Sequence, residues 1–186
     1  MQIKEVVRMA ALLKGREDVV KYLDTNTDMV SEETLVATAT LVDLVNLVIN
    51  ELATSFVPLV KVEQKTPDYN GRIYYKNLSQ TPLKILKVTD LSGKAVECLQ
   101  SIEYIKVQST VQIEYEYLPK NATIAEQCPY SEKEISLAVL AFGVAAEFSI
   151  VEGSFEEAVM WHKRFEEGVK AIVIPKSCRL KERRWE

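Results

Sequence analysis

Few side chains in this chain are of the kinds that perform acid–base or nucleophilic chemistry, and none is spaced as in a known motif. The 186 residues include one histidine, His162, so any histidine-based triad would have to be built around it. His162 falls between Trp161 and Lys163 in a charged segment, which favours a partly exposed helix residue over a catalytic base. Asp43 and Glu51 share one predicted helix, where a solvated face is the simpler interpretation. The sequence contains no nucleophile elbow, glycine-rich phosphate loop, HExxH or CxxC motif. We therefore expect no catalytic residue, no cofactor and no metal site.

The composition is that of an ordinary soluble globular protein, with 47% hydrophobic and 27% charged residues. The net charge of −4 argues against nucleic acid as a partner of the whole surface, although it allows a local basic patch. Cys98, Cys128 and Cys178 are odd in number and match no metal-ligand spacing. We expect them to be reduced thiols in a cytosol.

The sequence also favours a protein made inside a cell and not inserted in a membrane. Charged residues stand near the N-terminus, where the apolar segment of a signal peptide would begin. The most apolar window, 35–56, is interrupted by Asp43, Asn46, Asn50 and Glu51. Such interruptions are typical of the wet side of a soluble helix.

Helical spacing at both ends of the chain and alternation in the middle predict an α+β fold. N-terminal helices are expected over 3–13 and 17–23, followed by a long helix that Ser31 caps and Pro58 ends. The apolar stripe of the long helix comprises Leu35, Ala39, Val42, Val45, Ile49, Leu52 and Phe56. Because apolar residues also occupy its other faces, we expect this helix to be covered on more than one side, by its own domain and by another subunit.

Six short strands are expected in the middle of the chain. They cover 60–65, 72–75, 83–88, 95–99, 104–107 and 111–117. Since the gaps between them are of hairpin size, they would form a compact antiparallel sheet or a small barrel.

A helical hairpin is expected after the strands. Ser131 and Glu134 fit a capping box that opens its first helix, and Gly153 separates that helix from a second one over 155–169. The apolar stripe of the first helix comprises Ile135, Val139, Phe142 and Ala146.

This order predicts an inserted β segment between two halves of a helical domain. The expected parts are N-terminal helices (1–59), an antiparallel β subdomain (60–118), a helical hairpin that completes the helical domain (130–174) and a basic C-terminal arm (175–186).

Two aromatic residues of the last helix, Trp161 and Phe165, are spaced four residues apart and are candidates for a subunit interface, with core packing as the alternative. The small-residue run 138–146 has the same two interpretations. Glu147, next to this run, is either a rim carboxylate or a partner for Arg164 on the facing helix.

The C-terminal arm is the one local charge anomaly, with five basic and two acidic residues in 176–186. Arg179, Arg183, Arg184 and Trp185 are therefore candidate interface residues that would dock on a neighbouring subunit, with the tryptophan as an apolar anchor. The alternatives are a solvated terminus and contact with phosphate.

Four places in the chain resemble the head–tail adaptor (neck, connector) proteins of tailed phages and prophages of Gram-positive bacteria. They are residues 3–13 (IKEVVRMAALL) with 15–19 (GREDV), 50–59 (NELATSFVPL), 141–148 (AFGVAAEF) with 153–158 (GSFEEA), and 183–185 (RRW). The resemblance spans nearly the whole chain and consists of packing and turn patterns. The β segment is larger than in the simplest, mostly helical adaptors. The resemblance therefore does not distinguish an adaptor from a stopper or a tail-completion protein.

The resemblance implies a non-enzymatic virion component, made in the bacterial cytoplasm and built into the virion neck. Such proteins form a homo-oligomeric ring, commonly of twelve copies, between the portal and the tail-completion proteins. They need no cofactor, and DNA passes through the channel without specific binding. An acidic channel lining would repel the phosphates and let the genome slide.

Two other classes of function remain open from the residues alone. The first is a small-molecule or peptide-binding α+β module of a bacterial cell, with a pocket beside the β segment. The tyrosines that would line it are Tyr74, Tyr75, Tyr104, Tyr115 and Tyr117, with ordinary strand packing as the simpler interpretation. The second is an enzyme of unknown type.

Overall fold

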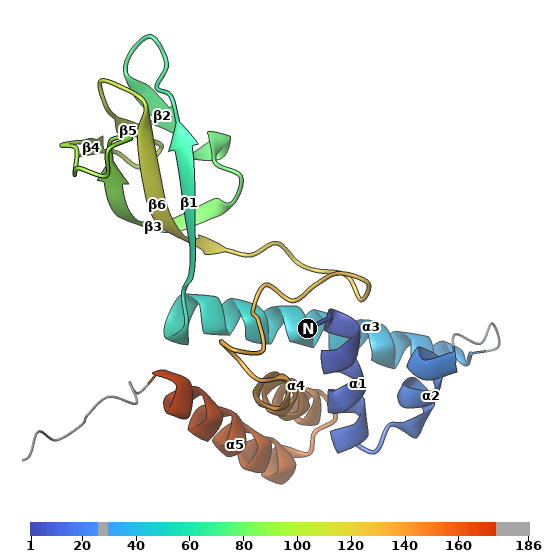
Figure 1. Ribbon diagram of the computed structural model, residues 1–186. Coiled ribbons are helices and arrows are strands. Elements are labelled where there is room, and N and C mark those ends of the chain that lie inside the picture. The colour runs from blue at the N-terminus through green and yellow to red at the C-terminus, as the bar shows by residue number, and fades with distance from the viewer. Residues whose placement is uncertain (26–29, 174–186) are drawn as a thin grey trace, which may run out of the picture.

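The computed structural model of the protein describes residues 1–25 and 30–173, and its fold is of the α+β class that the sequence predicts. Helices from both ends of the chain pack into a helical body (within 1–58 and 130–173), and the strands between them form a β body (59–118) that projects from it (Figure 1). The β body consists of two three-stranded antiparallel sheets. Among the described residues they do not close into the small barrel that the sequence allowed.

The N-terminal half of the helical body contains three helices and a π-helical turn. They are α1 (Ile3–Leu13), α2 (Glu17–Thr25), α3 (Glu32–Glu51) and the π-helix η1 (Leu52–Phe56). The Ser31 hydroxyl accepts a hydrogen bond from the Thr34 amide at 3.2 Å, as the cap prediction requires. The expected uninterrupted helix to Phe56 is wrong in its last turn, where the Val57 amide donates to the carbonyl of Leu52 at 2.8 Å and closes the wider π turn.

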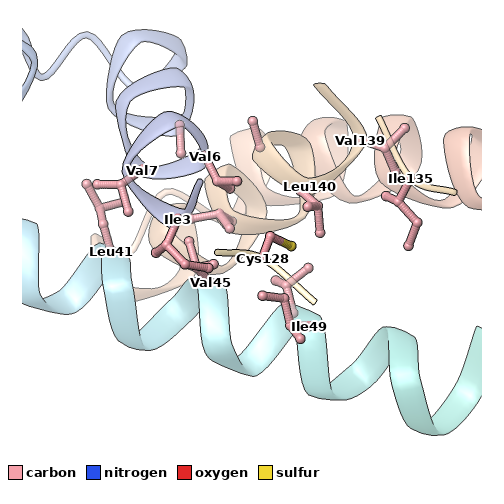
Figure 2. Close-up of a cluster of buried hydrophobic side chains, with 14 of the residues drawn as sticks. Ile3, Val6, Val7, Leu41, Val45, Ile49, Cys128, Ile135, Val139 and Leu140 are labelled. Carbon is pink, nitrogen blue, oxygen red and sulfur yellow. The ribbon is translucent and has the colours of Figure 1, made fainter. Parts of the chain in front are cut away.

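The buried face of the helical stretch formed by α3 and η1 agrees with the stripe that the sequence predicts at Val45, Ile49 and Leu52, but not at Leu35 and Ala39. Leu35, the first residue of that stripe, is 47% exposed, whereas Leu41 is fully buried. Figure 2 shows Leu41, Val45 and Ile49 pointing toward α1 and the C-terminal helices. Because α3 is apolar on several sides, spacing alone could not select the face that its neighbours cover.

The C-terminal half of the helical body contains α4 (Leu137–Val151) and α5 (Phe155–Val173). The prediction that the first of them begins at Ser131 is wrong. Glu134 does accept hydrogen bonds from the Ser131 amide and hydroxyl, both at 2.8 Å, but this closes an isolated turn. A second serine, Ser136, caps the helix itself. Helix α4 is buried on almost all sides, and α1, α3 and α5 pack around it (Figure 1).

The β body is built from two sheets that enclose a small core of their own. The first sheet has the order β1–β6–β3 and the second the order β2–β5–β4. The strands are β1 (Leu59–Lys65), β2 (Arg72–Tyr74), β3 (Thr81–Thr89), β4 (Leu99–Gln100), β5 (Tyr104–Lys106) and β6 (Val111–Leu118), and a 3-10 turn, η2 (Tyr75–Asn77), follows β2. The strand expected over 95–99 shrinks to β4 and one isolated bridge between Thr89 and Ala95. The core residues between the sheets include Ile73, Ile105, Val111, Ile113 and Tyr115.

One helical stretch, Glu32–Phe56, is long and apolar enough to cross a membrane by length and composition alone. Half of its most apolar window is buried inside the protein, in the core that Figure 2 shows. The core helix of a soluble protein has the same length and composition, so this stretch is weak support for a membrane span.

Candidate subunit interface

Trp161 lies in the seam between α4 and α5. Its side chain is 8% exposed, and its ring stacks on Phe142 of α4 with centroids 5.7 Å apart and an interplanar angle of 17°. The guanidinium of Arg164 covers the Trp161 ring at 5.0 Å. Trp161 therefore joins the two helices of the hairpin.

Phe165 is buried more deeply, with 1% of its surface exposed. It meets Phe56 edge to face at 6.4 Å, and a Cβ added to Gly143 would lie 3.0 Å from the Phe165 ring and 2.9 Å from Val48. Gly143 thus allows the close approach of three helices. The core-packing interpretation holds for Trp161 and Phe165, and neither ring is free to anchor a neighbouring subunit.

The other predicted interface residues, Arg179, Arg183, Arg184 and Trp185, lie outside the described residues. The proposed pair of Glu147 and Arg164 is not formed, because Arg164 covers aromatic rings instead.

Glu147 has a carboxylate as its neighbour. Burial raises the pKa of Glu51 on α3, the nearby charge of Glu147 raises it further, and His162 opposes the shift. The carboxylates of Glu51 and Glu147 therefore repel each other.

Large apolar side chains are exposed on α5 and at the tip of the α4–α5 hairpin, which sequence reasoning missed. Phe155 is 67% and Val159 70% exposed, and Ile150 and Val151 at the end of α4 are also exposed. We call Phe155 and Val159, on one side of helix α5, the α5 face. The sequence did contain a sign of this surface. Phe155 and Val159 are four residues apart, as on one face of a helix, and this face lies beside the stripe that contains Trp161 and Phe165.

A second apolar surface is a groove of about 460 Å³ along α3. Leu35, Ala39 and Val42 form one wall, and Ala122 and Ile124 of the segment before the hairpin form the other. We call it the α3 groove. Helix α4 lies between α3 and α5, so the groove and the α5 face belong to helices on different sides of the helical body (Figure 1).

A buried lysine fixes the position of the hairpin. The side chain of Lys14, just after α1, is 4% exposed and bonds to Glu157, to Glu152 at 3.1 Å and to the Ser149 hydroxyl at 2.9 Å. Burial disfavours the charge, but the hydrogen bonds to the two carboxylates outweigh it and raise the pKa of Lys14. The ammonium therefore ties α1 to the turn that precedes the α5 face.

Replacing Lys14 by methionine is expected to lower the free energy of unfolding by about 2 kcal/mol. The effect stays below that of a fully buried pair because Glu152 and Glu157 remain 35% and 52% exposed and can return to water. Urea unfolding measures the change, and Lys21→Met, which removes an exposed pair with Glu17, serves as the control with about 0.5 kcal/mol or less. Equal losses in the two variants would contradict a special role for Lys14.

The most connected polar cluster of the β body surrounds Glu63 on β1. Its carboxylate accepts hydrogen bonds from Tyr115 at 2.5 Å and from the Ser79 amide and hydroxyl, and Lys65 lies 3.1 Å away. Burial opposes its ionisation, but these hydrogen bonds dominate and lower the pKa of Glu63 to about 2. A carboxylate with so low a pKa is a poor proton acceptor at neutral pH. The cluster therefore links β1 to the segment after η2.

Replacing Glu63 by glutamine is expected to remove part of the acid sensitivity of the protein. The pKa of Glu63 is lower in the folded state than its ordinary 4.5, so its stabilisation is present above that value and is lost as the pH falls toward 2. Between pH 7 and pH 3 the native protein should lose about 2 kcal/mol that Glu63→Gln does not lose. Urea midpoints at the two pH values measure this, with the exposed Glu97→Gln as control. An unchanged pH dependence in Glu63→Gln would contradict the role of the cluster.

The five tyrosines proposed to line a pocket do not converge on one site, because four of them form two separate pairs, Tyr74 with Tyr104 and Tyr115 with Tyr117. Tyr115 is fully buried in the β core, and the Tyr75 hydroxyl donates to the Ser101 carbonyl at 3.0 Å. Tyr74 and Tyr104 contact each other on the outer face of the second sheet, with centroids 5.8 Å apart. Within the described ranges no group of histidine, cysteine or acidic residues has the arrangement of a metal site.

The chain was compared with known protein families and with curated proteins. No protein-family model and no curated protein matches it.

Proposed function

We propose that this protein is a structural subunit of a phage or prophage particle, which forms a ring at the head–tail neck between the portal and the tail-completion proteins. One observation carries the proposal. Two different apolar surfaces, the α5 face and the α3 groove, are exposed on helices on different sides of the same body.

Two unlike surfaces are what a head-to-tail contact requires. In a ring each subunit presents one patch to the neighbour ahead and another to the neighbour behind, whereas a two-fold dimer uses one patch twice. We therefore pair the α5 face of one copy with the α3 groove of the next. Phe155 and Val159 supply the apolar anchors, and Leu35 and Val42 supply the walls that receive them.

The distribution of charge supports the same proposal. Segments 1–58 and 130–173 carry nine basic and seventeen acidic residues, whereas the arm 175–186 carries five basic and two acidic ones. The basic arm of one subunit is thus complementary to the acidic helical body of another. An excess of carboxylates along a ring channel would also keep DNA phosphates from adhering. The resemblance of the four sequence segments to head–tail adaptors is the support for a phage or prophage particle as the assembly.

The solution mass of the purified intact chain tests the proposal. Light scattering over a wide range of concentration should show a defined ring-sized oligomer that dissociates on dilution. A monomer at every concentration would contradict self-assembly through these surfaces.

A further inference from the structure

Basic and aromatic side chains alternate on the outer face of the second sheet. Arg72 of β2 lies opposite Lys106 of β5, and Tyr74 lies opposite Tyr104 in the same register. Ile73, between Arg72 and Tyr74, points the other way and is buried in the β core. The sheet therefore presents a row of two cations and a row of two tyrosines on one side.

The cations of this face keep their charge available for a ligand. The Arg72 guanidinium lies 4.7 Å from the centre of the Tyr104 ring, and the Lys76 ammonium lies 5.4 Å from that of Tyr74. Tyrosine rings hold such cations in place without neutralising them. Among the described residues, Arg72, Lys76 and Lys106 form no ion pair with a carboxylate.

Three acidic residues lie near this face. Asp68 is the nearest to Arg72, and its carboxylate already accepts hydrogen bonds from the backbone amides of Asn70 and Arg72, both at 2.8 Å. Glu103 and Glu97 are both exposed, and Glu97 also lines a recess together with Lys106. Asp68 therefore offsets part of the Arg72 charge, but it forms no ion pair with Arg72, and Lys76 and Lys106 form none with the other two carboxylates.

A recess opens beside Lys106. It has a volume of about 960 Å³, and its lining includes Lys106, Asn70, Gln108 and Ser109. The rest of its lining consists of the apolar Val96, Cys98, Leu99 and Val107, the backbone of Gly71 and the carboxylate of Glu97. The amide and hydroxyl groups offer both donors and acceptors, and the apolar side chains offer contact area to a ring. Tyr69, in the turn next to the recess, is 96% exposed. A planar polar group has room here, and an aromatic ring stands free beside it.

We propose that this face of the β body binds single-stranded nucleic acid. Arg72, Lys76 and Lys106 contact successive phosphates, while an unstacked base enters the recess or lies against Tyr69. Cations along a strand path combined with exposed aromatic rings are the general means by which proteins hold single strands without reading their sequence. This activity is independent of the ring contacts proposed above, because none of its residues belongs to the α5 face or the α3 groove.

A single strand fits these features better than an acidic protein segment does. Its phosphates repeat at a regular spacing along a flexible backbone, which suits cations distributed along a sheet. Its bases can leave the stack and present both polar edges and a flat ring, which suits the mixed polar and apolar lining of the recess.

Fluorescence anisotropy with a labelled oligothymidine, at low salt, tests the proposal on the intact chain. We expect the logarithm of the association constant to fall linearly with the logarithm of the salt concentration. The slope should be about −2, because three phosphate contacts on a single strand release about that many counterions. The triple variant Arg72→Gln, Lys76→Gln, Lys106→Gln should bind about tenfold more weakly or worse. The matched control is Lys84→Gln, Lys87→Gln, Lys94→Gln, which removes the same charge from exposed lysines of the β body and should bind as the native protein does.

Three outcomes would overturn this inference. One is no binding by the native protein at low salt, and another is an equal loss in the two triple variants, which would indicate attraction by overall charge. The third is displacement of the oligonucleotide by poly-glutamate as readily as by unlabelled strand, which would indicate an acidic protein partner. Circular dichroism confirms that each variant is folded. Light scattering on the same samples separates this test from ring assembly, because the triple variants should keep the native mass.

Discussion

Replacing Phe165 by alanine should lower the free energy of unfolding by about 3–5 kcal/mol. The ring is 1% exposed and fills the space between Phe56, Val48 and Gly143, where three segments of the helical body meet. Its removal leaves a cavity that the neighbouring helices cannot close, because Gly143 already brings them as near as the backbone allows. Chemical denaturation followed by circular dichroism measures the change.

Phe155→Ala is the matched control, since it removes the same ring from the same helix at a position that is 67% exposed. Its stability should stay within about 0.5 kcal/mol of the native value. If Phe165→Ala instead kept its stability and lost only the ability to assemble, the assignment of Phe165 to the core would be wrong.

The double variant Phe155→Glu, Val159→Glu should abolish assembly and leave the fold intact. Each new carboxylate would be buried without a partner when the α5 face meets the α3 groove, which is strongly unfavourable. We expect the dissociation constant between subunits to rise by about a hundredfold or more, equivalent to about 3 kcal/mol. Light scattering measures the assembly and urea unfolding the stability.

Leu91→Glu, Ile102→Glu is the control for that variant. These residues are 59% and 95% exposed in loops of the β body, away from both helical surfaces. The control should assemble as the native protein does. Loss of assembly in both double variants would show that added negative charge, and not the α5 face, is responsible.

The α+β class and the order of elements could be predicted from the sequence because local signals define them. The cap at Ser31, the break at Gly153 and the alternation over 111–117 each reflect a few neighbouring residues. The start of α4 was misplaced for the same reason. Ser131 and Glu134 have the local chemistry of a cap and form a capped turn, but the helix begins after Ser136, whose exposed hydroxyl accepts a hydrogen bond from the Val139 amide.

The candidate surfaces were harder to predict because they depend on partners distant in sequence. Lys14 binds Glu152 and Glu157 across the helical body, and no local pattern indicates that pairing. Trp161 and Phe165 have the composition of interface anchors, yet α4 covers them. Conversely, Phe155 and Leu35 have the residue types of a core but are exposed. The type of an apolar residue does not indicate which neighbour, if any, will cover it.

The central claim, a head-to-tail contact between two unlike surfaces, is tested most directly by the mass of a mixture. One component is Phe155→Glu, Val159→Glu, which lacks a working α5 face, and the other is Leu35→Glu, Ala39→Glu, which lacks a working α3 groove. Each should be monomeric alone. Their equimolar mixture should show twice the chain mass in light scattering and nothing larger, because one intact contact remains per pair. A mixture that stays monomeric, or a single variant that assembles unaided, would contradict the account.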